Sequence, residues 1–383
     1  MKKNIIFLLL ASWLLSLSGL AQQVEQLKVA SMNIDGLPKK ILVFNVNADG
    51  PGEAGTSRIG KYITKNGFDI ACFQEDFNYH EVMVPWLEDD YHIDQWSGAV
   101  GIDVPDYKVD LLHAQNVKFP CDGLGACWKR NIVETATERV TWKKTFGKFS
   151  HALDELVTKG FRRSELTLAS GARIIVYNTH MDASDRRDAM EGRDSLDRDA
   201  RLSEWRQLCD DVLAHLDTRP VIIVGDMNSY YARDKVKAEF IDKIAESGKG
   251  TAYDVWVELE KGGKYPEPKE GAVFSDDPSK LIDGEGLDKI IYINPTAGTQ
   301  LRALSFDVDI EGYQHDGQPL GDHYPAIATF AVENAKTAVM SLPEEMVVET
   351  PAEYYDLKGV RVDAPSKGIY IEHQGKHNRK RVR

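Results

Sequence analysis

The chain has 383 residues, with 47 Lys plus Arg against 60 Asp plus Glu and a formal net charge of −13. Hydrophobic residues make up 42% and charged residues 28% of the sequence, which is typical of a globular protein and excludes a fibrous or largely disordered chain. The acidic balance argues against binding nucleic acid through non-specific phosphate contacts alone, although a bound divalent cation can reverse the local field. The length fits one large domain with appendages as well as two domains.

The first residues have the features of a secretory signal peptide. Lys2 and Lys3 precede an apolar run that ends in Gly19-Leu20-Ala21, a small-x-small cleavage pattern. Removing residues 1–21 discards two lysines and no acids, so the charge becomes −15 (45 minus 60). No Cys follows the cut, and no later apolar stretch is long enough to span a bilayer. The sequence therefore predicts a secreted, cell-surface or periplasmic protein without a transmembrane segment.

Export to an oxidising compartment permits disulfides among the four cysteines. Cys121 and Cys127 flank DGLGA, whose two glycines allow the chain to fold back, so we expect a Cys121–Cys127 disulfide. Cys72 lies in an apolar strand and Cys209 on the inner face of a helix, which indicates buried free thiols. The cysteine spacing does not match a structural zinc site.

Apolar strands alternate with helical stretches along the chain. Hydrophobic periodicity and capping residues predict helices and strands with the following bounds. Strands are expected at residues 27–32, 70–74, 173–178, 221–224, 287–293 and 324–332, and helices at 58–65, capped by Thr56-Ser57, and at about 197–217.

Polar residues with catalytic potential lie at or next to the ends of several of these strands. In VIIVGDMNS, residues 221–229, a buried strand is followed by Asp226 and Asn228, which point to the same side if the extended backbone continues. Taken alone, that segment is more often a strand followed by an Asx-rich turn. The strand-end residues that together favour one convergent site are Asn33, Glu75, His180, Asp226, Asn228, Asp288, Asp322 and His323.

The segments ASMNIDG, CFQED, VYNTHMDAS, VIIVGDMNS, GLDKIIYIN and GDHYPAIATF resemble, in order, those of the endonuclease/exonuclease/phosphatase superfamily. That superfamily includes deoxyribonuclease I, abasic-site endonucleases, inositol polyphosphate 5-phosphatases and neutral sphingomyelinases, and CDGLGACWK resembles the sphingomyelinase branch. The resemblance implies an α/β fold, a four-layer sandwich of two mostly antiparallel sheets flanked by helices. We expect this catalytic domain to span residues 22–333.

The resemblance also implies a metal site. Hydrolysis of an anionic phosphodiester needs a cation on the phosphoryl oxygens and a base for the attacking water. Glu75 is the expected principal ligand of Mg²⁺, with Mn²⁺ or Ca²⁺ as alternatives. Asn33 is expected either to bind the cation directly or to hydrogen-bond to its ligands. Asp322 is expected to bind a second cation or to adjust the affinity of the site for the first.

The remaining site residues match catalytic positions of the family. Asp226 and Asn228 are expected to orient the attacking water and contact the phosphate. His323 matches a histidine that acts as general base or as a phosphate-binding imidazolium, and Asp288 is expected to hold its ring nitrogen. His180 matches a histidine placed against the phosphate and leaving group, which favours branches other than the abasic-site endonucleases.

The substrate is less clearly indicated by the sequence. Arginines in the segment DRRDAMEGRDSLDRDAR, together with Arg162 and Arg163, are candidates for binding a second phosphate or a lipid head group. The alternative is a solvated loop with internal ion pairs. We expect a monomer that hydrolyses a phosphodiester, either in a phospholipid head group with peripheral membrane contact or in nucleic acid. The other class of function left open is a non-catalytic surface-binding module with a relic site.

The composition changes after about residue 334. Residues 334–352 are expected to form a linker, and residues 353–383 contain two short strand-like pieces, a Gly turn and a basic end. YDLKGVRV followed by KGIYI resembles the C-terminal sorting segment of proteins exported by the type IX system of Bacteroidetes. A small β-hairpin appendage with a disordered basic tip is the alternative.

Overall fold

The computed structural model describes residues 25–41, 44–45, 47–98, 121–147, 154–155, 157–269 and 284–333, and the backbone of 353–355, 369–374 and 377–382. The expected signal peptide lies outside these residues. The chain divides into two units, Met1–Ala335 and Lys336–Arg383.

The larger unit contains two six-stranded sheets, each with one parallel pair among antiparallel neighbours. The first sheet has the order β13 (Gln300–Val308), β16 (Ala326–Glu333), β1 (Glu25–Asn33), β4 (Ile70–Gln74), β6 (Gly125–Lys129) and β5 (Tyr91–Ile93). The second sheet has the order β11 (Gly250–Asp254), β12 (Asp288–Pro295), β10 (Val221–Asp226), β9 (Arg173–His180), β8 (Gly160–Thr167) and β7 (Val133–Thr141). The parallel pairs are β1 with β4 and β9 with β10.

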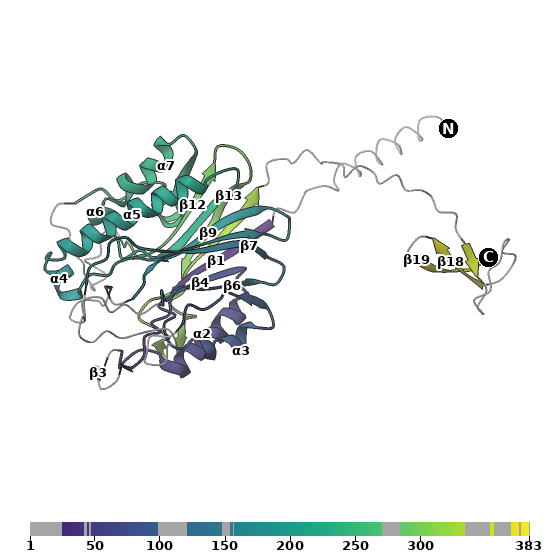
Figure 1. Ribbon diagram of the computed structural model, residues 1–383, viewed down its shortest axis with the longest axis horizontal. Helices are drawn as coiled ribbons and strands as arrows, with labels where there is room; N and C mark the ends of the chain where they lie inside the picture. Colours follow the sequence, from purple (N-terminus) through teal and green to yellow (C-terminus); the bar gives the residue numbers. More distant parts are fainter. Residues whose placement is uncertain are drawn as a thin grey trace, which may run out of the picture. The chain divides into compact units, whose positions relative to one another are not determined.

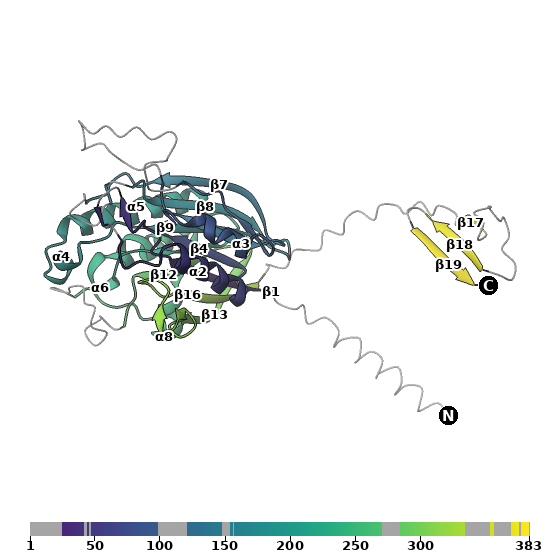
Figure 2. The same ribbon diagram turned by 90° about the horizontal axis from the view of Figure 1, so that it is seen from below.

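Helices cover the outer face of each sheet, so the unit has the four predicted layers (Figures 1 and 2). The first sheet is covered by α2 (Gly52–Asn66) and α3 (Val84–Leu87), and the second mainly by α5 (Ser195–His215), the π-helix η3 (Lys237–Ile241) and α7 (Asp242–Glu246). The shorter elements are β2 (Lys40–Ile41), β3 (Phe44–Asn45), η1 (His80–Val82), α4 (Arg186–Met190), α6 (Tyr231–Asp234), α8 (Val255–Glu260), β14 (Gln314–His315) and β15 (Gln318–Pro319). Within the described residues, no helix combines the length and the apolar character that a bilayer span requires.

The apolar core has three layers because alternate side chains of each strand point to opposite faces. Between the sheets, Val29 and Ile70 meet Val176 and Val224 of the opposite sheet. Outside them, Ile59 of α2 belongs to one helix-facing cluster, and residues of α5 such as Trp205 and Leu208 belong to the other. The continuous apolar run of β10 is buried on both faces, as predicted for residues 221–224.

Two local predictions were wrong. The helix expected at 58–65 begins at Gly52, and the Thr56 hydroxyl donates to the Gly52 carbonyl from within the helix instead of capping its first turn. The Cys121–Cys127 disulfide is not formed, and all four cysteines are buried free thiols. Cys127 lies in β6 against the α2 layer, whereas Cys121 packs with Phe77 and Val157 in a separate cluster.

The smaller unit forms an antiparallel sheet of β17 (Glu353–Tyr355), β18 (Ile369–Gln374) and β19 (His377–Val382). The sequence predicts only two strand-like pieces there. The basic end of the chain forms the third strand, because pairing with β18 satisfies its backbone N–H and C=O groups.

Candidate functional site

Three side chains of the site lie side by side across the second sheet. In the strand register, Asp226 of β10 is opposite His180 of β9 on one side and Asp288 of β12 on the other. Gly225 precedes Asp226, and a Cβ at that position would lie only 1.9 Å from the Thr179 carbonyl oxygen, so the close approach of β9 requires glycine. Asp226 is therefore the central member of this row.

The first sheet contributes Asn33 and Glu75 to the same site. Asn33 ends β1, and Glu75 directly follows β4, which runs parallel to β1. The Asn33 side-chain Nδ2 donates to Glu75 Oε1 at 3.0 Å and to Asp226 Oδ2 at 3.1 Å. The Asn33 Oδ1 accepts from the Asp35 backbone N–H at 3.0 Å. Asn33 thus links carboxylates of both sheets.

Strained backbone is concentrated at this edge. Glu75 has φ +58°, Asn228 +47° and Asp35 +49°, three of the five non-glycine residues with positive φ in the described chain. Such conformations cost free energy for residues with a side chain and persist only where the surroundings hold them. Asn228 is held by its backbone N–H, which donates to Asp226 Oδ1 at 3.0 Å, and by its side chain, which donates to the Met181 carbonyl at 3.1 Å.

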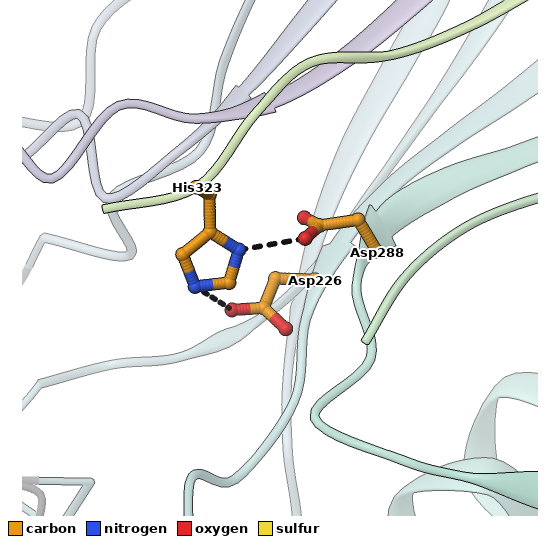
Figure 3. A group of neighbouring side chains, drawn as sticks. All are labelled: Asp226, Asp288 and His323. Atoms are coloured by element: carbon orange, nitrogen blue, oxygen red, sulfur yellow. Dashed lines mark hydrogen bonds and ion pairs between the residues drawn. The ribbon is translucent and has the colours of Figure 1, made fainter. Parts of the chain in front are cut away.

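His323 reaches the site from the loop before β16. Its Nδ1 lies 2.6 Å from Asp288 Oδ2 and its Nε2 lies 3.8 Å from Asp226 Oδ2 (Figure 3). Burial opposes the positive charge of the ring, but Asp288 and Asp226 outweigh it and hold the pKa of His323 well above its usual value. The charged imidazolium is therefore the favoured form at neutral pH.

His180 has a different environment. Its side chain is 1% exposed, and its Nε2 lies 3.6 Å from Asp226 Oδ2, 3.9 Å from Glu75 Oε1 and 3.2 Å from Lys159 Nζ. Burial and the Lys159 charge lower the pKa of His180 well below its usual value. The site thus places a neutral imidazole and an imidazolium on opposite sides of Asp226.

The carboxylates of the site carry negative charge that the described residues do not fully balance. Burial, together with the nearby Asp322, raises the pKa of Glu75 to about 7. Burial and Asp322 also raise the pKa of Asp35 to about 6, and Asp288 Oδ1 is buried without a hydrogen-bond partner. Asp322 itself is exposed, so it acts on the site through its charge from the rim.

These oxygen donors fit a hard divalent cation. Asp226, Asp288 and His323 each offer one ligand atom within 4.8 Å of the others. A cation at that trio would compete with the short His323–Asp288 hydrogen bond. Glu75, whose side chain keeps 22% exposure, offers a carboxylate that solvent and an ion can reach beside Asp226. Glu75 and Asp226 are therefore the better pair of ligands.

Comparison with known proteins agrees with this architecture. The chain is 26% identical over 279 residues to a sphingomyelinase of Mycobacterium tuberculosis, a match that covers 72% of this chain and 47% of the relative. The same identity and coverage are found for a sphingomyelinase of Mycobacterium bovis. The chain thus spans about half the length of these curated relatives. No protein-family model matches the sequence.

Solved structures share the fold at lower sequence identity. The D. rerio TDP2 complexed with single-strand DNA product has a TM-score of 0.51 and 15% identity, covering 80% of this chain and 99% of that one. An endonuclease/exonuclease/phosphatase from Bacteroides vulgatus has a TM-score of 0.51 and 14% identity, covering 81% and 100%. The fold is deoxyribonuclease I-like. The predicted four-layer fold and its resemblance to the endonuclease/exonuclease/phosphatase proteins are confirmed.

The deoxyribonuclease I-like fold does not bring every predicted residue to the site. Arg163 lies on β8 opposite Tyr177, on the face that α5 covers, where it forms ion pairs with Glu138 and Asp211. Its predicted contact with substrate is wrong for this structure, because His180 is an odd number of residues beyond Tyr177 and faces the other way.

The polar segment after His180 mostly forms ion pairs within itself. Arg187 pairs with Glu191, and Arg193 pairs with Asp188 and Glu191. Arg201 is 1% exposed and donates to Ser184 Oγ at 2.8 Å. These contacts correspond to the alternative of a loop with internal ion pairs.

One functional candidate was missed by sequence reasoning. Lys159 is 4% exposed, touches His180 and forms an ion pair with the buried Asp154. Burial opposes its charge, but Asp154 and Glu75 raise the pKa of Lys159, so it remains an ammonium. Nothing in the sequence pattern distinguishes this lysine from the other basic residues, because it precedes its strand without any catalytic signature.

Proposed function

We propose that this chain is a secreted, Mg²⁺-dependent phosphodiesterase. It hydrolyses a phosphodiester bond of a phospholipid head group, in the manner of a sphingomyelinase-like phospholipase C. The observation that carries the reaction type is the convergence of Glu75, Asn33 and the row His180–Asp226–Asp288 in a deoxyribonuclease I-like fold. The sequence match to sphingomyelinases over most of the chain supports the head-group substrate. The acidic net charge is also unfavourable for nucleic acid.

The site residues divide the chemistry as follows. Glu75 and Asp226 would hold Mg²⁺, with Asn33 fixing both carboxylates. A bound Mg²⁺ supplies Lewis acidity at a phosphoryl oxygen. Burial opposes the ionised form of Asp226, but the charge of His323 outweighs it and lowers the pKa of Asp226, which remains ionised and orients the attacking water. Asn228, whose amide is fixed on the Met181 carbonyl, keeps the backbone beside Asp226 in place.

Positive charge near the phosphate comes from two sides. The His323 imidazolium, held by Asp288, can donate to an anionic phosphoryl oxygen through Nε2. The Lys159 ammonium supports the buried His180 on the opposite side of Asp226. Such preorganised donors stabilise the charge that develops on the phosphoryl oxygens and the leaving group.

A second candidate substrate is nucleic acid, favoured by the fold shared with a TDP2 that binds a single-strand DNA product. The discriminating experiment measures phosphocholine release from sphingomyelin vesicles beside plasmid nicking, each with Mg²⁺ and with EDTA. We expect EDTA-sensitive phosphocholine release. Nicking without phosphocholine release would assign the nuclease function. The absence of both activities would favour a non-catalytic binding module.

Export is part of the proposal. The signal peptide pattern at residues 1–21 supports it, and the basic C-terminal segment supports sorting to the cell surface. Mass measurement of the protein recovered from the producing cells should place its first residue near Gln22.

A further inference from the structure

The apolar core between the two sheets ends in two buried amides. Ile70 and Cys72 point into this core from β4, and the next residue on the same face is Gln74. Val176 points into it from β9, and the next residue on that face is Asn178. Gln74 is 0% and Asn178 2% exposed, so both amides are removed from water.

Hydrogen bonds between these residues cross from one sheet to the other. Gln74 Nε2 donates to Asn178 Oδ1 at 2.7 Å. Asn178 Nδ2 donates to the carbonyls of Phe73 at 2.9 Å and Gly125 at 2.8 Å. Phe73 and Gly125 are the last register partners of β4 and β6, so the Asn178 amide of the second sheet closes the end of this ladder in the first. Ser31 Oγ of β1 donates to Gln74 Oε1 at 3.4 Å.

These bonds lie next to the site. Gln74 immediately precedes Glu75, and Asn178 lies two residues before His180 on the same strand. The Gln74 carbonyl accepts from the Ile34 backbone N–H at 2.9 Å, which holds the chain where Glu75 turns into its left-handed conformation.

We propose that Gln74 and Asn178 are positioning residues that fix how one sheet lies over the other. They thereby set the position of Glu75 relative to His180 and Asp226. Apolar contacts are non-directional and tolerate small shifts of one sheet over the other. Hydrogen bonds between buried amides are directional and costly to leave unmade, so they select one position of the first sheet over the second. This inference rests on the proposed function, because the geometry that it fixes is that of the cation and phosphate site.

The test compares Gln74→Met and Asn178→Leu, which keep side-chain volume and remove the hydrogen bonds, with Val176→Ala. Val176 lies on the same strand and the same face as Asn178, but its contacts are apolar. Each variant is measured for thermal midpoint, Mg²⁺ affinity by calorimetry, kcat and KM, and the NMR ring signals of His180 and His323. Both amide variants should lose roughly 10- to 100-fold in Mg²⁺ affinity or kcat, the usual effect of losing a residue that orients ligands.

Val176→Ala should lower the thermal midpoint but leave the Mg²⁺ affinity, kcat and histidine signals unchanged. The double variant should lose less than the product of the two single losses, because the amides act as one unit. If Asn178→Leu does not fold, the measurements on Gln74→Met test the proposal. This variant should fold because the hydrogen bonds from Asn178 to the Phe73 and Gly125 carbonyls remain in place. Amide variants that match Val176→Ala in every site measurement would overturn the positioning role.

The proposed function can fail separately. A wild-type protein that neither binds Mg²⁺ nor cleaves sphingomyelin or DNA would contradict it. The histidine ring signals would still test the positioning role: movement in the amide variants alone supports it, and signals that match those of Val176→Ala contradict it.

Discussion

Lys159 Nζ lies 3.2 Å from His180 Nε2 in the interior of the protein, and both side chains are almost completely buried. Burial and the ammonium, which repels a charged ring, together lower the pKa of His180 and keep the imidazole neutral. The buried Asp154 balances the lysine from its other side.

Replacing Lys159 should therefore separate stability from catalysis. Lys159→Met removes a charge beside His180 and should lower kcat by on the order of 10²-fold, as expected for a group that stabilises transition-state charge. It also leaves Asp154 buried without its partner, so the thermal midpoint should fall. Adding Asp154→Asn should recover the thermal midpoint but not kcat. Recovery of both would assign Lys159 a purely structural role.

Glu75 is the carboxylate on which Mg²⁺ affinity should depend most. Glu75→Gln keeps the shape and the hydrogen-bond acceptor for Asn33 but removes the charge, so Mg²⁺ affinity should fall by roughly tenfold or more. Calorimetric titration measures it, with the exposed Glu246→Gln as a control for the loss of one negative charge elsewhere. Equal affinities in the two variants would remove Glu75 from the metal site.

Mg²⁺ affinity should increase with pH across neutrality. The pKa of Glu75 is raised to about 7 in the metal-free protein, so the carboxyl group is mostly protonated below that pH and mostly ionised above it. Because the ion must displace the proton, the dissociation constant at pH 6 should be about tenfold larger than at pH 8. Titration in two buffers with different ionisation enthalpies should also show proton release near pH 7. A pH-independent affinity would show that the ion binds elsewhere.

The His323–Asp288 pair should control the alkaline side of the pH–rate profile. Asp288 raises the pKa of His323, so Asp288→Asn should lower that pKa and shift the loss of activity to lower pH. His323→Ala should reduce turnover by about 10²- to 10⁴-fold. NMR titration of the His323 ring supplies the pKa directly. Activity that instead rises with deprotonation of His323 would identify it as the general base.

Arg201 should be important for stability and not for chemistry. Its guanidinium lies among the buried carboxylates Asp194 and Asp234, at 3.6 Å and 3.2 Å respectively. Arg201→Met removes one of the cations around these carboxylates, while Asp194 keeps Arg233 and Asp234 keeps Arg198. Breaking a buried ion pair in this way typically costs up to about 3–5 kcal/mol of unfolding free energy. The exposed Arg187, which pairs with Glu191 on the surface, is the matched control, and Arg187→Ala should cost about 1 kcal/mol or less. Urea unfolding measures both, and a similar small loss in both would contradict the expectation.

The sequence determined the strands and the residues at their ends. The apolar run of β10 and the periodic helix α5 could be predicted because burial on one or both faces imposes a spacing on apolar residues along the chain. Asn33, Glu75, His180, Asp226, Asp288 and His323 were identified in the same way, since each lies at or next to an end of such a strand. Contacts between residues close in sequence therefore left a readable pattern.

Only the tertiary structure decided which side chains meet. Lys159 contacts His180 across 21 residues, and Asn33 contacts Asp226 across 193. Cys121 and Cys127 are close in sequence but belong to separate clusters, and Arg163 faces the helix layer instead of the site. The side chain of a strand residue points to one of the two faces of its sheet. Which residue of the other sheet it meets depends on the strand order and on how one sheet lies over the other. Hydrogen bonds such as that between Gln74 and Asn178 fix the position of one sheet over the other, and they leave no periodic signal in the sequence.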